Sequence, residues 1–110
     1  MRRVIIESPY AGDVDRNLVY LRACIRDCLR RGEAPFASHG LYTQPGVLDD
    51  NQPADRVIGI AAGFEWRLAA NATVVYTDLG ISRGMQLGIG HAESVGHGHV
   101  VEYRQLGGAW

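Results

Sequence analysis

One stretch, residues 74–92, constrains the fold more than any other part of the chain. It opens with the β-branched and aromatic run Val74-Val75-Tyr76, breaks at Gly80, and continues from Ser82 as a helical pattern. This order predicts a strand, a tight loop and a helix. The first N–H groups of a helix point at the space above the end of such a strand, where the helix dipole favours an anion. The stretch therefore predicts either a phosphate or carboxylate site or an ordinary helix that Ser82 caps.

Length and composition indicate one globular domain. The chain has 110 residues, of which 46% are hydrophobic and 21% are charged. We expect a domain over residues 1–106 and a C-terminal tail over 107–110. No segment has the apolar length that crosses a bilayer, and the start lacks the apolar run of a signal peptide, so we expect no membrane partner and a cytoplasmic location. The formal charge of −1 argues against a nucleic-acid polymer as partner.

Strand and helix patterns alternate along the chain. Strands are expected over residues 3–7, 34–38, 74–77 and 100–103, and helices over 14–31, 53–71 and 82–95. Pro35 cannot donate to a strand ladder, so the second strand is expected at the sheet edge. The alternation favours a parallel sheet with helices on both faces. The apolar residues that mark the expected buried helix faces are Val14, Leu18, Leu21, Ile25 and Cys28, then Val57, Ile60, Ala61, Phe64 and Leu68, then Met85, Ile89 and Ala92.

Three loops are expected to form a ligand site. Ligands of such folds bind above the carboxyl ends of the strands, where the loops 8–13, 38–50 and 78–84 should meet. The connection over residues 39–53 is long for a compact domain. We expect it to be either a lid over a ligand or a contact between subunits.

The sequence resembles the nucleoside 2-deoxyribosyltransferase superfamily, which includes nucleotide N-glycosidases. The resemblance lies in MRRVIIESPY at residues 1–10, in GFEW and NATVVY within residues 63–76, and in residues 78–92. The sequence is also similar to short bacteriophage proteins of that fold. The resemblance implies a flavodoxin-like, three-layer α/β/α fold with a four-stranded parallel sheet in the order 2-1-3-4. It also implies a nucleoside or nucleotide ligand and a homodimer or higher homo-oligomer.

Both reactive acids of the superfamily are expected to be missing. Its nucleophilic Glu lies four residues after a Gly on the helix that follows the third strand, and Gly88 occupies that place here. Its second acid corresponds to Gly63. Glycine at both places predicts extra pocket volume without a nucleophile, although Gly84 and Gly88 also suit a helix that closely approaches the sheet. By contrast, Ser82, Arg83 and Gly84 match the Ser-x-Gly segment that holds the 5′-phosphate in nucleotide-cleaving relatives.

The candidate ligand-binding residues come from the three loops and the third helix. They are Ser8, Pro9, Tyr10, Asp13, His39, Tyr42, Asp78, Ser82, Arg83, Gly84 and Gly88. Tyr10 is a candidate for stacking on a base or for plain packing. No metal and no cofactor are expected, because the His-Gly-His of residues 97–99 is a weak metal pattern.

Three functional hypotheses remain open. The first is non-catalytic binding of a nucleotide-derived small molecule, with sequestration of a host signalling nucleotide by a phage anti-defence protein as its purpose. The alternative is an active nucleoside or nucleotide N-glycosidase or deoxyribosyltransferase whose acids have moved to Asp78, Glu65 or Glu93. The third is a structural component with a vestigial pocket.

Overall fold

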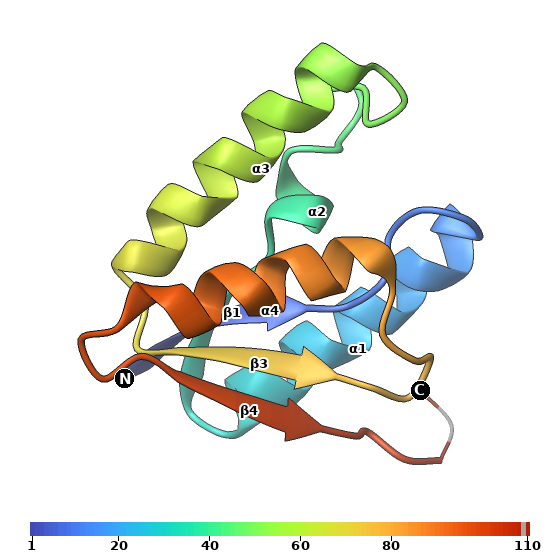
Figure 1. Ribbon diagram of the computed structural model, residues 1–110. Coiled ribbons are helices and arrows are strands. Elements are labelled where there is room, and N and C mark those ends of the chain that lie inside the picture. Colours follow the sequence, from blue (N-terminus) through green and yellow to red (C-terminus); the bar gives the residue numbers. More distant parts are fainter. Residues whose placement is uncertain (109) are drawn as a thin grey trace.

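The computed structural model describes residues 1–108 and 110, in which strands and helices alternate (Figure 1). The strands are β1 (Arg2–Glu7), β2 (Glu33–Phe36), β3 (Ala72–Tyr76) and β4 (Val100–Arg104). The helices are α1 (Val14–Arg30), α2 (Ser38–Leu41), α3 (Pro53–Leu68) and α4 (Arg83–Val95). The predicted alternation is confirmed, with the short helix α2 added inside the long connection. Within the described residues, no helix has the length and apolar character that crossing a membrane requires.

The strands form one parallel sheet in the order β2-β1-β3-β4, as predicted. Val4 of β1 lies between Pro35 of β2 and Ala72 of β3. Pro35 therefore lies in an edge strand, where its missing N–H costs no ladder hydrogen bond on the open side. All five residues of β3 are buried, as expected for a central strand with helices on both faces.

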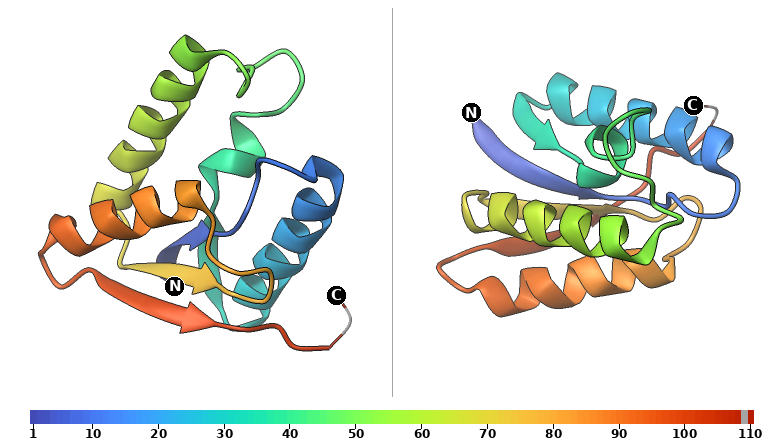
Figure 2. Two further views of the ribbon diagram at one scale, coloured as in Figure 1. Left: turned by 45° about the vertical axis from the view of Figure 1, so that its right-hand side comes forward. Right: turned by 90° about the horizontal axis from the view of Figure 1, so that it is seen from above.

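Helices cover both faces of the sheet, so side chains that alternate along a strand enter two different cores (Figure 2). On one face, Val4 and Ile6 of β1 pack in a cluster with Tyr20 and Cys24 of α1. On the other face, Val75 of β3 packs against α4. The predicted buried face of α4 is confirmed by its buried Met85, Ile89 and Ala92.

Helix α1 is turned slightly from its predicted orientation. Tyr20 and Cys24 are completely buried, although the apolar spacing did not mark them as core residues. Leu18 and Ile25 are only partly buried, whereas Leu21 and Cys28 are buried as predicted. The aromatic ring of Tyr20 and the thiol of Cys24 thus define the centre of the face that packs on the sheet.

The predicted buried face of α3 is correct only at Ile60 and Phe64, which are half-buried and line the pocket described below. Val57 is 66% exposed and Leu68 is 60% exposed, whereas Gly63 and Arg67 are buried. The cause is the position of the helix, which rises away from the sheet and packs on α2 and α4 (Figure 1). A helix that covers no broad apolar surface has no need of a wide apolar stripe. Its inward side instead lines a pocket.

Candidate functional site

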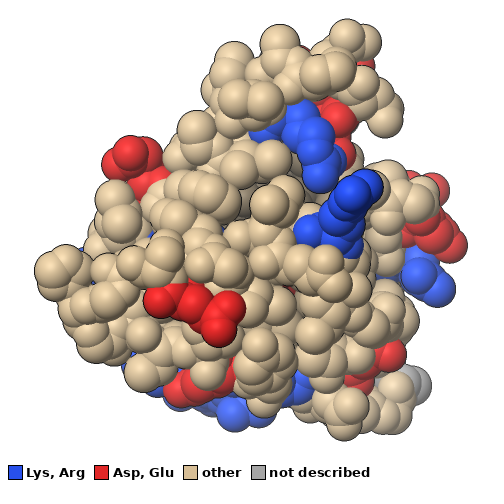
Figure 3. All heavy atoms as spheres, viewed as in Figure 1, with Lys and Arg blue, Asp and Glu red and all other residues tan. Residues whose placement is uncertain are grey.

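A pocket of about 330 Å³ lies between α3, α4 and the segments that follow β1 and β2. Its lining includes residues from all three predicted loops and from the inward side of α3. In the space-filling view, basic side chains face each other across the hollow below α3 (Figure 3). The volume lies in the range of pockets that bind small molecules.

One end of the pocket, which we call the basic end, is formed by Arg56, Arg83 and the start of α4. A side-chain carbon built on Gly84 would lie 3.9 Å from Nη2 of Arg56, so this guanidinium points at the first turn of α4. The hydroxyl of Ser82 accepts a hydrogen bond from the backbone N–H of Met85 at 3.2 Å, which confirms Ser82 as the N-cap. The N–H groups of Arg83 and Gly84 lie in the first turn and lack intrahelical partners. These donors favour an anion, although Arg56 also pairs with Asp50 of the pocket lining at 3.1 Å.

The inner end of the pocket contains a buried ion pair between Glu7, at the end of β1, and Arg67 of α3. The Arg67 side chain is 3% exposed and that of Glu7 is 13% exposed. Arg67 Nε donates to the Thr73 hydroxyl at 3.1 Å, and Arg67 Nη1 contacts His91 Nδ1 at 3.2 Å. These contacts fix the guanidinium, and the guanidinium in turn fixes one oxygen of Glu7.

Burial raises the pKa of Glu7 to about 7, although the positive charge of Arg67 opposes the shift. Burial also lowers the pKa of His91, and the nearby charge of Arg67 lowers it further. Neutral His91 can accept the hydrogen bond from Arg67 through Nδ1, whereas protonated His91 cannot. A carboxyl group that titrates near neutrality in a pocket is a frequent property of functional sites.

The space next to Gly88 is not empty, contrary to the prediction of extra volume. A side-chain carbon built on Gly88 would overlap the carboxylate of Glu7. One built on Gly63 would lie 2.9 Å from the Ser38 hydroxyl oxygen. Both glycines are therefore needed for close approach, but the neighbours are polar side chains rather than the sheet backbone. The carboxylate of Glu7 fills the volume that a side chain at position 88 would take.

Ser8 and His39 form a second polar pair in the pocket lining, with Ser8 Oγ 2.7 Å from His39 Nε2. Burial lowers the pKa of His39 to about 4, so its imidazole is neutral at pH 7. Ser8 is buried, with 5% of its surface exposed. The pair therefore orders the segment after β1 against α2.

Apolar and aromatic side chains line the space between the two ends. Tyr10, Tyr42, Leu48 and Phe64 all take part. The Phe64 ring stacks on the His91 ring of α4, with the ring centres 3.8 Å apart and the planes 4° apart. This stacking joins α3 to α4 and covers one face of the Phe64 ring.

Eight of the eleven candidate binding residues line the pocket. They are Ser8, Tyr10, His39, Tyr42, Ser82, Arg83, Gly84 and Gly88. Pro9 is not part of the lining, and Asp13 caps α1 by accepting from the Arg16 N–H at 3.3 Å. The connection over residues 39–53 also contributes Thr43, Leu48 and Asp50 to the lining.

Asp78 lies outside the pocket lining, contrary to the expectation that its loop would bring it there. Its carboxylate accepts from the Tyr20 hydroxyl at 2.6 Å and from the N–H groups of Leu106 and Gly107, each at 2.9 Å. It therefore anchors the C-terminal segment beside α1. The other two fallback acids, Glu65 and Glu93, are exposed and also lie outside the lining.

Sequence reasoning missed the charged residues Glu7, Arg56 and Arg67. Glu7 had a recognisable signal, because an acid that directly ends a buried parallel strand lies at the ligand-binding edge. Arg67 follows Ile60 and Phe64 at helical spacing, so it continues the inward side of α3. Arg56 precedes Ile60 and Phe64 at the same kind of spacing, so it lies on the inward side of α3 as well.

Comparisons with known proteins agree with this fold. The solved structure of a 2-deoxyribosyltransferase from the psychrotolerant bacterium Bacillus psychrosaccharolyticus is similar, with a TM-score of 0.61 and 14% sequence identity. The similarity covers 97% of this chain and 76% of that chain, and at this identity it shows the fold alone. None of the curated proteins matches the sequence. The sequence model of one family matches residues 2–103, and the chain therefore belongs to the family described as Domain of unknown function (DUF7768).

Proposed function

We propose that the protein binds a nucleotide-derived small molecule in this pocket, of the size of a nucleoside 5′-monophosphate, and releases it unchanged. The observation that carries the proposal is the basic end, where Arg56 and Arg83 line the pocket beside the first turn of α4. A phosphate bound there accepts hydrogen bonds from the backbone and from guanidinium groups.

The rest of the pocket supports the same ligand class. Phe64, Tyr10 and Tyr42 provide aromatic surface in the pocket lining, beside its charged and polar groups. A base stacks on such a surface, while the sugar lies between base and phosphate. The likeness of the fold to a 2-deoxyribosyltransferase is consistent with this class of ligand.

The carboxylates of the pocket support binding without turnover, because each one is held by another group of the chain. Glu7 pairs with Arg67, and Asp50 pairs with Arg56 at 3.1 Å. Asp55 accepts from the backbone N–H of Asp49 at 2.8 Å. Cleavage of a glycosidic bond requires a nucleophilic or basic carboxylate and a second proton-transferring group. A carboxylate in an ion pair is a weaker nucleophile.

A second candidate function is nucleotide N-glycosidase activity with Glu7 as the relocated acid. The specific observation is that the Glu7 carboxylate fills the volume beside Gly88, where the superfamily resemblance implies the nucleophile. In this mechanism the carboxylate attacks the anomeric carbon and the bond to the base breaks. The leaving base takes a proton from a water molecule. A second water then hydrolyses the sugar ester, which releases the sugar phosphate and restores the Glu7 carboxylate.

Incubation with AMP, GMP, CMP and UMP separates these functions. We expect one or more of them to raise the unfolding temperature, with about 2.7 kcal/mol of stabilisation at 100 times the dissociation constant. Chromatography after heat release should return the nucleotide intact. Release of free base by the wild-type protein, but not by Glu7→Gln, would establish the second candidate function. The absence of stabilisation at millimolar concentration by any of the four would contradict the proposed function.

Binding without turnover suits a sequestering role. Because the sequence resembles short bacteriophage proteins, we propose that the protein removes a host signalling nucleotide during infection. Depletion of such a nucleotide from an extract by the wild-type chain, but not by Arg83→Ala, is the expected result.

A further inference from the structure

We propose that Glu7 binds the 2′- and 3′-hydroxyl groups of the ligand's sugar, so that the pocket selects ribonucleotides over 2′,3′-dideoxynucleotides. This inference rests on the proposed function, because it takes the phosphate of the ligand to lie at the basic end. It adds a specificity-determining residue to that function.

The first step is that one oxygen of Glu7 remains open. Oε2 is engaged by Arg67, and no hydrogen bond from the described residues reaches Oε1. In the part of the chain that the structure describes, Asn17 Oδ1 is the one side-chain polar atom that is both fully buried and without a partner. Glu7 Oε1, which also lacks a partner, is thus not fully buried. Glu7 Oε1 is therefore accessible, and because Glu7 lines the pocket, it is accessible from there. It is a charged acceptor without a partner from the chain.

The second step is the position of this acceptor along α4. The Glu7 carboxylate contacts the helix at Gly88, whereas the basic end lies at Gly84. Four residues along a helix correspond to about 6 Å, or roughly one turn. In a nucleotide the sugar follows the phosphate directly and the base lies farther away. With the phosphate at the first turn of α4, the group one turn farther along is the sugar.

A carboxylate with one oxygen free can bind the hydroxyl groups of a sugar. A carboxylate accepts several hydrogen bonds, and acidic side chains bind ribose hydroxyls in dinucleotide-binding folds. Arg67 fixes the orientation of the carboxylate, since it is itself held by Thr73 and His91. Arg67 is thus a positioning residue. A second phosphate at this place would be repelled by Glu7, whereas hydroxyl groups would be attracted.

The test measures the dissociation constants of AMP, GMP, CMP and UMP and of their 2′,3′-dideoxy counterparts by calorimetry at pH 8. For the wild-type protein we expect each ribonucleotide that binds to bind at least about tenfold more tightly than its dideoxy counterpart, the usual scale for hydrogen bonds to a charged group. Glu7→Gln should reduce this ratio to about threefold or less. In this variant the Gln amide oxygen accepts the hydrogen bond from Arg67, so the NH₂ group faces the pocket. A neutral donor then replaces the charged acceptor that the sugar hydroxyl groups would contact.

Arg83→Ala is the matched control, because it weakens binding of both forms through the phosphate and should leave the ratio unchanged. Equal affinity of the wild-type protein for both forms would overturn the inference while the proposed function stands, and this comparison needs no variant to fold. A ratio that Glu7→Gln leaves intact would also overturn it. Failure of all eight nucleotides to bind would instead refute the proposed function.

Discussion

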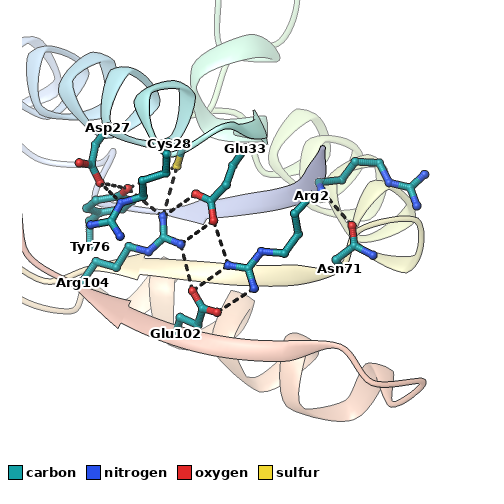
Figure 4. A network of polar contacts seen from close by, with 10 residues as sticks. Arg2, Asp27, Cys28, Glu33, Asn71, Tyr76, Glu102 and Arg104 are labelled. Carbon is teal, nitrogen blue, oxygen red and sulfur yellow. Dashed lines mark hydrogen bonds and ion pairs between the residues drawn. The ribbon is translucent and has the colours of Figure 1, made fainter.

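Charged side chains pair on both faces of the sheet, and the two groups differ in how many of their hydrogen-bonding atoms have partners. On the face that α1 covers, a network joins Arg2, Glu33, Glu102 and Arg104 (Figure 4). On the face that α3 and α4 cover, Glu7 pairs with Arg67 alone among the charged residues. The first group is closed on itself, whereas the second leaves an acceptor toward the pocket.

The closed network holds its acids strongly ionised. Arg104 donates to both oxygens of Glu33, at 2.8 and 2.7 Å, and Arg2 donates to Glu33 at 2.9 Å. These hydrogen bonds, that from Arg104 above all, lower the pKa of Glu33 to about 2. At Glu7 burial outweighs the single guanidinium and raises the pKa instead. The difference indicates that the network ties strands together, while the pair is suited to a ligand.

The largest effect is expected from Arg104→Met, which tests the structural role of the network. It leaves Glu33, whose side chain is 8% exposed, with Arg2 as its remaining basic partner. We expect a loss of about 3 kcal/mol in the free energy of unfolding, the low end for breaking a buried ion pair. Urea denaturation measures it. The control Arg31→Ala removes an exposed pair with Asp27 and should cost at most about 1 kcal/mol. Equal losses would show that the network contributes no more than a surface pair.

Gly88→Ala should have a smaller effect on stability and should disrupt the pocket pair. The added carbon displaces the Glu7 carboxylate, and we expect a cost of about 1–3 kcal/mol, as in other overpacked sites. Gly90→Ala on the same helix is the control, since nothing lies within 4 Å of a carbon added there. Replacing this helical glycine should stabilise the fold by about 0.5–1 kcal/mol. Denaturation of both variants measures the contrast, and a stable Gly88→Ala protein would mean that Glu7 moves freely.

The third effect is a difference in pH dependence between wild type and Glu7→Gln. The folded-state pKa of Glu7, about 7, lies above its ordinary value of 4.5, so its contribution to stability is present below pH 4.5 and is lost as pH rises through 7. The free energy of unfolding of wild type minus that of Glu7→Gln should therefore fall between pH 5 and pH 8. His39 contributes with the opposite sign but titrates in both proteins, so it cancels in the difference. A difference that does not change with pH would contradict the raised pKa of Glu7.

The pKa shift of Glu33 has the opposite sign to that of Glu7, and the stabilisation that Glu33 contributes is lost as pH falls from 4.5 toward 2.

The sequence predicted those features that local patterns and chain order determine. The apolar period of Met85, Ile89 and Ala92 and the cap at Ser82 indicated the orientation of α4. The β-α alternation indicated a parallel sheet, and the resemblance implied its strand order. Helix α3 was misjudged because its apolar residues are largely exposed, so periodicity alone did not reveal which side faces inward. The predicted homo-oligomer stays a prediction, which sedimentation measurements would test.

The site was predicted in part, and its limits have a physical cause. Arg83 and Gly84 could be located because a helix start after a buried strand has a known direction. Glu7 could have been located as the acid that ends a buried strand, but its pairing with Arg67, 60 residues away in the sequence, could not. The extra volume predicted beside Gly88 is filled by the Glu7 side chain, which comes from another element. Whether a missing side chain leaves a cavity depends on three-dimensional neighbours, and no local spacing encodes them.

The attachment of α3 has a consequence for the evolution of the family. The helix rises away from the sheet and borders the pocket, while the two cores lie against α1 and α4. Substitutions along its inward side can therefore widen or narrow the binding space with little loss of packing in the sheet. Under the proposed function, substitutions on this one helix would change which ligands fit, with Arg67 as the position that must be kept because it holds Glu7 and Thr73 of the sheet.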